Sequence, residues 1–256
     1  KDIDPEQTKL HEALAEEAWK LSDKGGMPMR CIVFCNSRES AQKVQEELTA
    51  KATKARVTID CDLFVGGRRV HERDEASKWL RGRGFLAGST VNPPQATFLV
   101  ATSAGEVGVD LDADHMVADV VAWERMVQRL GRVNRRGEGD AQVVVVRSAA
   151  SKKDQQALDK DPAERNTQER AIAARLEISA AAVRVLRQLP RRGDAFDASP
   201  GALTSLKQRA QNDSELATLL AAATTPPPLH PALSRALVES WSMTSLEEHT
   251  GRPEVE

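Results

Sequence analysis

The sequence predicts an α/β domain, in which helices cover both faces of a parallel sheet, followed by a helical appendage. Short apolar runs bounded by turn residues are typical of buried strands, and the amphipathic segments between them are typical of helices. This alternation implies parallel strands joined by crossover helices. The strand signals stop near residue 150, whereas helical periodicity continues beyond it.

The first part of the chain supplies the alternating elements. Residues 6–21 show helical periodicity, and the run CIVFC at 31–35 predicts a strand whose following helix is capped by Asn36 or Ser37. Ligands of such sheets bind beyond the carboxyl ends of the strands, so a functional site is expected there. The other predicted strands are 57–65, 97–101, 116–122 and 142–146, and the other predicted helices are 70–81 and 123–131.

The second part of the chain carries only helical signals. Helices are predicted over 163–189, 201–223 and 231–248, with a stiff break at the prolines 226–228. We therefore expect two regions, an α/β domain at 1–150 and a helical linker or accessory region at 151–256. No chemistry can be assigned to the second region from its sequence.

Composition narrows the class of protein. A net charge of −2 over 256 residues argues against a surface coated in basic groups, but it leaves room for a narrow groove that holds a few phosphates. No apolar run approaches the roughly 18 residues of a membrane-spanning helix, so no membrane partner is expected. The chain starts without Met and ends abruptly, so we expect a fragment of a longer polypeptide.

The cysteines and histidines do not predict a metal site. Cys31, Cys35 and Cys61 lack a second pair of ligands at zinc-binding spacing, and none of the five histidines has HExxH spacing. The cysteines are instead expected to be reduced core thiols of a cytoplasmic protein.

Four arginines crowd the segment QRLGRVNRR at 128–136, which follows a predicted helix. Gly131 and Asn134 interrupt the run, which indicates a helix end that turns into a loop. Guanidinium groups present a planar fork of donors, so a cluster of them suits a polyphosphate. The alternative is a solvated helix end with salt bridges. The full pattern Gln-Arg-x-Gly-Arg-x-x-Arg is far more specific than a bare arginine-rich run.

Two further segments place polar residues after predicted strands. FLVATSAGEVGVDLDADHMV at 98–117 contains a buried strand, a small-residue turn and an acidic loop. Gly105 and Gly108 in this turn permit close approach of the backbone to a ligand. CIVFCNSRESA at 31–41 places Asn36 and Ser37 at a strand end, where they are either phosphate contacts or a plain helix cap.

These three segments, in this order, resemble motifs IV, V and VI of superfamily 2 helicases over residues 31–136. The resemblance implies that residues 1–150 form the second RecA-like domain of such an enzyme. By the resemblance to motif VI, Arg132 and Arg135 reach the γ-phosphate of ATP as arginine fingers. Gln128 matches the Gln or His of the family, and Arg129 braces the motif internally. In other nucleotide hydrolases an arginine finger raises the rate by about 10³–10⁵.

The resemblance also assigns each remaining candidate residue either to the nucleotide-binding site or to the nucleic-acid-binding site. By the resemblance to motif V, Gly108 and Asp110 lie near the ribose of ATP and couple the two sites, and Arg129 is counted with them on the nucleotide side. The segment VGGRRVHERDEA at 65–76 resembles the stretch after motif IV that grips the nucleic-acid backbone. The residues expected to contact nucleic acid are Asn36, Ser37, Arg69, Arg73, Thr102 and Ser103.

The sequence contains no G-x-x-x-x-G-K-[ST] run, which would cradle the phosphates of a nucleotide. In the family, ATP and magnesium are bound mainly by the first RecA-like domain, which this chain lacks. The run DEAS at 74–77 is similar to a DEAD-type motif, but it lies on a predicted helix rather than after an apolar strand. We therefore expect this chain alone to hydrolyse ATP poorly.

The amino-acid sequences of the segments that resemble motifs V and VI indicate one family within superfamily 2. VATSAGEVGVDLDADHMVADVV followed by ERMVQRLGRVNRRGEG resembles the helicase core of the CRISPR-associated helicase–nuclease of type I systems. WSMTSLEEHTGRPEVE at 241–256 resembles the variant whose HD nuclease follows the helicase. The resemblance implies ATP-dependent 3′–5′ movement on single-stranded DNA after recruitment by an RNA-guided surveillance complex. It also implies two partners in the same polypeptide, the first RecA-like domain and the HD nuclease.

Two alternatives stay open on the sequence. The chain could belong to another superfamily 2 helicase that acts on DNA or RNA. It could also be a non-catalytic module that binds nucleic acid or a protein, with residues 151–256 as the docking region.

Overall fold

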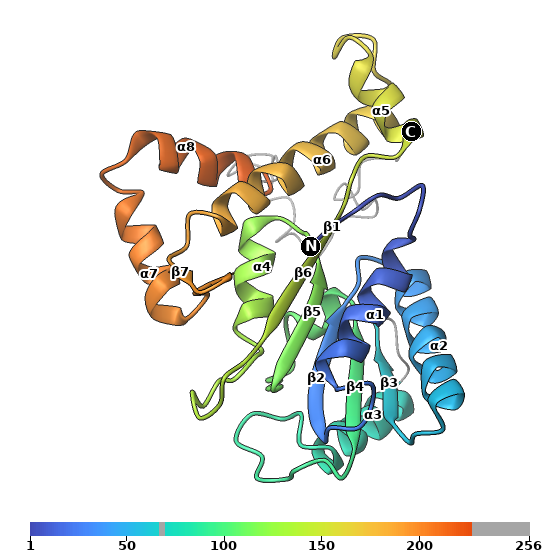
Figure 1. Cartoon of the computed structure of the whole chain (residues 1–256). Helices are drawn as coiled ribbons and strands as arrows, with labels where there is room; N and C mark the ends of the chain where they lie inside the picture. Colours follow the sequence, from blue (N-terminus) through green and yellow to red (C-terminus); the bar gives the residue numbers. More distant parts are fainter. Residues whose placement is uncertain (67–69, 227–256) are drawn as a thin grey trace, which may run out of the picture. The chain divides into compact units, whose positions relative to one another are not determined.

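Alternating strands and helices build the first 150 residues, as the sequence predicts (Figure 1). The computed structural model describes the chain at residues 1–66 and 70–226. The helices of this part are α1 (Leu10–Leu21), α2 (Arg38–Ala55), α3 (Val70–Gly82), the 3₁₀ turn η1 (Ser103–Gly105) and α4 (Trp123–Leu130). The strands are β1 (Asp2–Ile3), β2 (Met29–Phe34), β3 (Asp60–Phe64), β4 (Ala96–Ala101), β5 (His115–Asp119) and β6 (Val143–Ser148).

The six strands form one sheet in the order β1-β6-β5-β2-β4-β3, and every neighbouring pair is parallel. In the register of the central strands, Phe34 of β2 lies beside Ala101 of β4 and Ala118 of β5. The carboxyl ends of β2, β4 and β5 therefore meet at one edge of the sheet. The predicted RecA-like α/β fold is confirmed.

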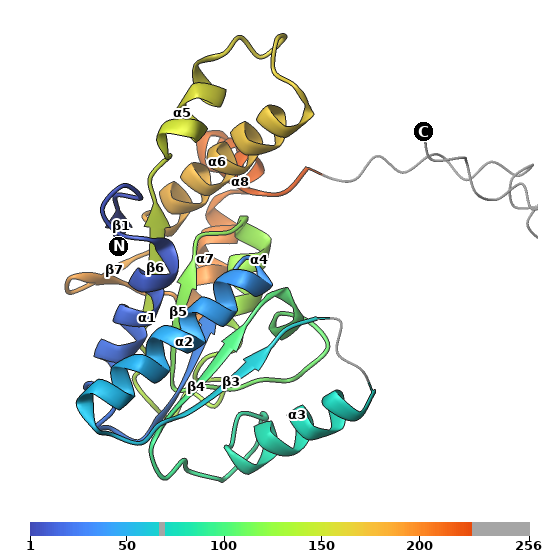
Figure 2. The same ribbon diagram turned by 90° about the vertical axis from the view of Figure 1, so that its right-hand side faces the viewer.

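Strand periodicity divides the core between the two faces of the sheet, because successive side chains of a strand point to opposite faces. Cys31 and Val33 belong to a buried cluster with the apolar sides of α1 and α2. Ile32 and Phe34 belong to a second cluster, which includes Leu80 of α3. Figure 2 shows α1 and α2 on one side of the sheet. Both faces are buried, which explains why these strands are continuous apolar runs.

The helical region packs onto the sheet rather than standing apart. Lys1–Thr225 form one compact unit. A third apolar cluster joins Val120, which follows β5, and Trp123, the first residue of α4, to buried residues of the last helices. Thr225 also donates through its hydroxyl to Glu124 of α4 at 2.6 Å. These helices are α5 (Lys152–Asp159), α6 (Thr167–Leu186), α7 (Pro200–Arg209) and α8 (Ser214–Ala223).

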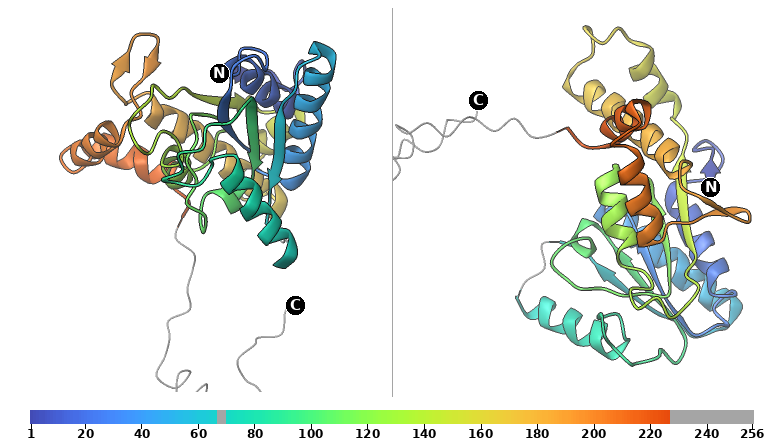
Figure 3. Two further views of the ribbon diagram at one scale, coloured as in Figure 1. Left: turned by 90° about the horizontal axis from the view of Figure 1, so that it is seen from below. Right: turned by 90° about the vertical axis from the view of Figure 1, so that its left-hand side faces the viewer.

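The structure corrects three predictions about this region. The single helix predicted at 201–223 is two helices, because the Asp213 carboxylate caps the backbone N–H of Leu216 and starts α8. Helix α5 was not predicted, although Ser151 and Asp154 form its capping box. Strands are also present: β7 (Arg191–Arg192) and β8 (Ala195–Phe196) form a hairpin that projects from the helices (Figure 3).

Some predictions fall outside the described residues, namely the helix at 231–248 and the segment 241–256. The division of the chain at residue 150 stays a prediction. Across the described ranges, no helix is both long and apolar enough to cross a membrane.

Candidate nucleotide and nucleic-acid interfaces

The arginine motif lies where α4 ends and the chain turns back. Helix α4 stops at Gly131, and Asn134 and Gly137 adopt positive φ angles of 46° and 69°. The turn is tied to the acidic loop before β5, since the Arg132 carbonyl accepts from Ala113 and the Ala113 carbonyl accepts from Asn134, at 3.0 and 2.8 Å. The two segments that resemble motifs V and VI therefore lie side by side.

The two candidate arginine fingers meet at one carboxylate. Arg132 Nη1 lies 3.3 Å from Asp110 Oδ1, and Arg135 forms an ion pair with the same oxygen. The backbone of Arg135 is fixed as well, because its N–H donates to Asp112 Oδ1 at 3.1 Å. Asp110 is 65% exposed and the Arg135 side chain is 37% exposed, whereas the Arg132 side chain is mostly covered, at 17%.

Arg129 is the opposite case, with a side chain that is completely buried. Its Nε donates to Glu106 Oε1 at 2.8 Å, and its Nη1 donates to Asp119 Oδ1 at 2.7 Å. Its guanidinium carbon lies 4.9 Å from the centroid of the Phe34 ring, which adds a cation–π contact. This geometry agrees with the bracing role that the motif implies. It leaves no exposed Arg129 atom for the nucleotide contact that was also expected.

Glu106 gathers three arginines around one residue. Its carboxylate accepts two hydrogen bonds from Arg125 and one from Arg129, and its carbonyl accepts from Arg132 Nη2 at 2.6 Å. Burial alone would raise the pKa of Glu106, but the hydrogen bonds from Arg125 and Arg129 outweigh it and lower the pKa. Glu106 is therefore charged at neutral pH. Burial raises the pKa of Asp119, and the positive charge of Arg129 opposes that rise.

Gly105 and Gly108 differ in what they do. A Cβ on Gly105 would lie 3.0 Å from the Ala101 Cβ and 3.1 Å from the Phe34 ring, so this glycine permits close packing inside the protein. Gly108 has a φ of 89° and open space around it, so it is exposed to an approaching ligand. Gln128 is also exposed, on α4.

The candidate nucleic-acid contacts follow neighbouring strands. Asn36 and Ser37 come after β2, and Thr102 and Ser103 come after β4, so the parallel register brings these two pairs to the same edge of the sheet. Asn36, Ser37 and Ser103 are exposed, and Thr102 is half-buried. Ser37 also caps α2 by accepting from the Ser40 N–H at 3.1 Å.

The remaining two candidates cannot be placed at this edge. Arg69 lies outside the described residues. Arg73 belongs to α3, and its side chain lies outside the described part.

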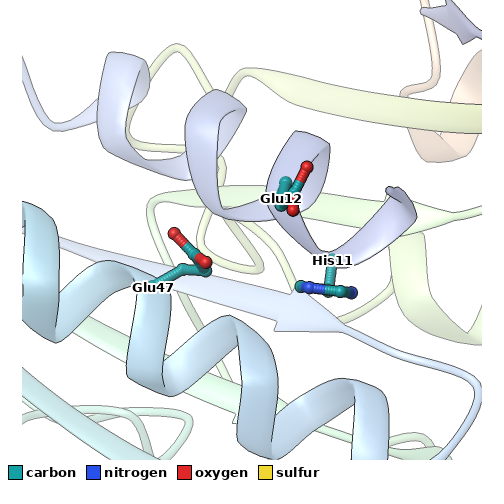
Figure 4. A group of neighbouring side chains, drawn as sticks. All are labelled: His11, Glu12 and Glu47. Carbon is teal, nitrogen blue, oxygen red and sulfur yellow. The ribbon is translucent and has the colours of Figure 1, made fainter. Parts of the chain in front are cut away.

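One group of possible metal ligands was missed by sequence reasoning. His11 and Glu12 of α1 lie near Glu47 of α2, with ligand atoms that are all within 4.8 Å of one another (Figure 4). The side chains are partly buried, and Glu12 is also engaged by the Lys9 backbone N–H at 3.2 Å. These residues come from two helices, so no spacing in the sequence could have joined them.

Glu106, Asp119 and Arg125 were also missed. Asp119 ends β5 and Arg125 lies in α4, 13 and 19 residues after Glu106. Each is an acidic or basic residue in or beside an apolar segment, which is the signal that could have marked them as buried ion pairs.

The parallel sheet, with the segments that resemble motifs V and VI side by side at one edge, gives a RecA-like α/β domain. Residues 29–138 match the family model described as "CRISPR-associated nuclease/helicase Cas3, C-terminal". This match covers less than half of the chain, and its family is the one that the motifs also resemble.

Solved structures agree on the fold. T. fusca Cas3 with ADP is 21% identical with a TM-score of 0.54, and the match covers 87% of this chain and 25% of that chain. T. fusca Cas3 with ATP is 19% identical with a TM-score of 0.52, covering 88% and 26%. A structure described as a CRISPR-associated protein is 19% identical with a TM-score of 0.52, covering 94% and 23%. The chain thus spans about a quarter of these proteins. No curated protein matches it.

Proposed function

We propose that this chain is the C-terminal half of an ATP-dependent 3′–5′ single-stranded DNA translocase that acts in CRISPR interference. It supplies arginine fingers and contacts to the DNA backbone, and it is incomplete alone. The observation that carries this proposal is the meeting of Arg132 and Arg135 at the exposed carboxylate of Asp110.

The donors at this position fit a polyphosphate. Two guanidinium groups lie side by side, and the Nε of Arg132 is buried without a hydrogen-bond partner in the described part of the chain. Such groups stabilise charge on a transferring phosphoryl group. ATP with Mg²⁺, held mainly by the first RecA-like domain, would supply the phosphoryl group and the free energy for movement.

Gly108, Asp110 and Gln128 complete the nucleotide side. Arg132 and Arg135 could exchange partners when nucleotide binds, because a phosphate could replace the Asp110 carboxylate as the partner of both arginines. Gly108 lies two residues before Asp110, with a positive φ and open space where a Cβ would be. Asp110 therefore holds Arg132 and Arg135 in place until a phosphate group, which binds guanidinium groups more strongly, replaces it.

Nucleic acid would lie across the carboxyl ends of β2 and β4. Small polar side chains and backbone N–H groups there suit phosphate oxygens, which carry no sequence information. The residues we assign to this contact are Asn36, Ser37, Thr102 and Ser103, with Arg69 and Arg73 from the following segment. Single-stranded DNA is the ligand that the Cas3 family implies.

The wider assembly belongs to the same proposal. The partners would be the first RecA-like domain and the HD nuclease of the same polypeptide, and an RNA-guided surveillance complex that recruits them in the cytoplasm. The motif wording and the match of residues 29–138 to the Cas3 family support this assignment.

Substituting a finger tests the proposal. In the full-length gene product, we expect Arg132→Ala to keep ATP affinity within about threefold and to lower turnover by up to about 10³-fold. Arg136→Ala is the matched control, since Arg136 lies in the same turn and, among the described residues, forms a single long ion pair, with Glu138 at 3.9 Å. Turnover that survives Arg132→Ala would remove the finger role.

A further inference from the structure

A line of polar contacts, buried at its centre, runs from the carboxyl end of β2 to Arg132. The backbone N–H of Asn36, two residues after β2, donates a hydrogen bond to the carboxylate of Asp119 at the end of β5. Asp119 accepts from Arg129, and Arg129 donates to Glu106. The Glu106 carbonyl in turn accepts from Arg132, which continues to Asp110. The line therefore begins at a proposed DNA contact and ends at a proposed arginine finger.

The same line has a second branch toward the DNA side. In η1, the N–H of Gly105 donates to the Thr102 carbonyl at 2.9 Å, and the N–H of Glu106 donates to the Ser103 carbonyl at 3.0 Å. Three residues thus separate Glu106 from Thr102, and all of them lie in one hydrogen-bonded turn. A shift of the Glu106 backbone must move this turn.

The central members of the line are buried ionisable residues. Glu106 is 3% exposed and Asp119 is 1% exposed, and the Arg129 side chain has no exposure. Charges in such surroundings are screened little by solvent, so each arginine is held firmly by its carboxylate. Through this clamp, the Glu106 carboxylate fixes the position of its own carbonyl, and the carbonyl orients Arg132.

The hydrogen bonding along the line is incomplete at three points. Among the described residues, Asp119 Oδ2, Arg129 Nη2 and Arg132 Nε are buried without a partner. Buried polar atoms normally have partners, so these three have unused capacity. All three atoms belong to this line, which gives its members the means to exchange partners when Arg132 moves.

We propose that Glu106 is a positioning residue for Arg132, and that Glu106, Arg129 and Asp119 together transmit the position of Arg132 to the DNA-contacting edge at Asn36 and Thr102. This inference rests on the proposed function. It assigns the coupling between nucleotide binding and DNA binding to three residues that are neither arginine fingers nor DNA contacts.

The test is the effect of nucleotide on DNA affinity in the full-length gene product. The dissociation constant of a labelled oligothymidine is measured by fluorescence anisotropy, with and without a non-hydrolysable ATP analogue. For the natural sequence we expect the analogue to change DNA affinity by about fivefold or more. In Glu106→Gln we expect that ratio to fall below about twofold, while affinity for the analogue stays within about threefold.

Asp114→Asn is the matched control. It makes the same carboxylate-to-amide change in the same loop and also breaks an ion pair with an arginine, Arg30, but it lies off the line. It should keep the ratio of the natural sequence. If Glu106→Gln acted only by lowering stability, it and Asp114→Asn would show similar ratios of DNA affinity with and without the analogue.

A milder variant keeps the test decisive if Glu106→Gln fails to fold. Arg125→Gln removes two of the three hydrogen bonds to the Glu106 carboxylate and leaves Arg129 in place. Arg125 is partly exposed, so this variant should fold, with a ratio reduced by at least about twofold. A natural ratio in every folded variant overturns the coupling role alone. A ratio of one in the natural sequence overturns the proposed function as well.

Discussion

Arg129 Nη1 donates to both the side chain and the backbone carbonyl of Asp119, at 2.7 and 3.0 Å. Because Asp119 ends β5 and Arg129 lies in the last turn of α4, this contact ties the arginine-bearing helix to the sheet. Both residues are buried, so neither charge has water as an alternative partner.

Removing the Arg129 guanidinium should therefore destabilise the fold strongly. We expect Arg129→Met to lower the free energy of unfolding by about 3–5 kcal/mol, because Asp119 and Glu106 lose a buried counter-charge. Urea denaturation of the chain measures the change. Arg136→Met, at the surface of the same turn, should change it by less than about 0.5 kcal/mol. Equal stabilities of the two variants would contradict the bracing role.

The ion pair of Asp114 with Arg30 should make stability depend on pH. Burial would raise the pKa of Asp114, but the hydrogen bonds from Arg30 outweigh it and lower the pKa below its ordinary value of 3.8. A lowered pKa contributes stability above the unfolded pKa, and that stability is lost as pH falls through the folded pKa. The contribution is thus complete at neutral pH and disappears below about pH 4.

Comparison with Asp114→Asn isolates this contribution. Asp114 is 37% exposed and solvent screens the pair, so we expect a difference of about 1 kcal/mol at neutral pH. The difference in unfolding free energy should shrink as the pH approaches about 3. A difference that stays constant over this range would show that the charge of Asp114 is not involved.

The backbone of Gly108 should resist substitution although nothing crowds it. Its φ of 89° is a conformation that residues with a Cβ rarely adopt, so Gly108→Ala should lower stability by about 1–2 kcal/mol. Gly82→Ala is the control, because Gly82 also has open space around it but has no positive φ. It should be neutral or stabilising by up to about 1 kcal/mol in thermal unfolding. Equal losses in both variants would exclude backbone strain as the cause.

The cysteines should react slowly in the folded protein. Burial raises the pKa of the Cys35 thiol to about 12 and that of Cys61 to about 12, and it raises the pKa of Cys31 further. The thiolate is the reactive form, so little of it exists near neutral pH. Titration with a chromogenic disulfide should label the thiols much faster in urea than in buffer. Rapid labelling of Cys31 and Cys35 in buffer would contradict their buried positions.

The sequence predicts the fold well where apolar periodicity is strong. Both faces of β2 are covered, so its side chains form one apolar run, and the same holds for β4. The hairpin of β7 and β8 escapes such reasoning because each strand has only two residues, joined through Gly193 at a φ of 61°. No periodicity can be read from two residues.

The candidate site could be predicted only in part. Arg132 and Arg135 carry a local pattern, which marks them as candidates without a structure. Glu106 and Asp119 lie in segments whose composition marks a loop and a strand end, and their roles depend on contacts with Arg129 across 23 and 10 residues. Whether an arginine is a finger or a brace also depends on burial, which this motif does not encode.

The most direct test of the central claim mixes this chain with a separately expressed ATP-binding half from the same gene and measures ATP hydrolysis with and without single-stranded DNA. We predict DNA-stimulated hydrolysis that needs both pieces, that is lost with Arg135→Ala and that is retained with Arg136→Ala. Hydrolysis that Arg135→Ala leaves unchanged would contradict the claim, as would no hydrolysis from pieces shown to be folded and associated.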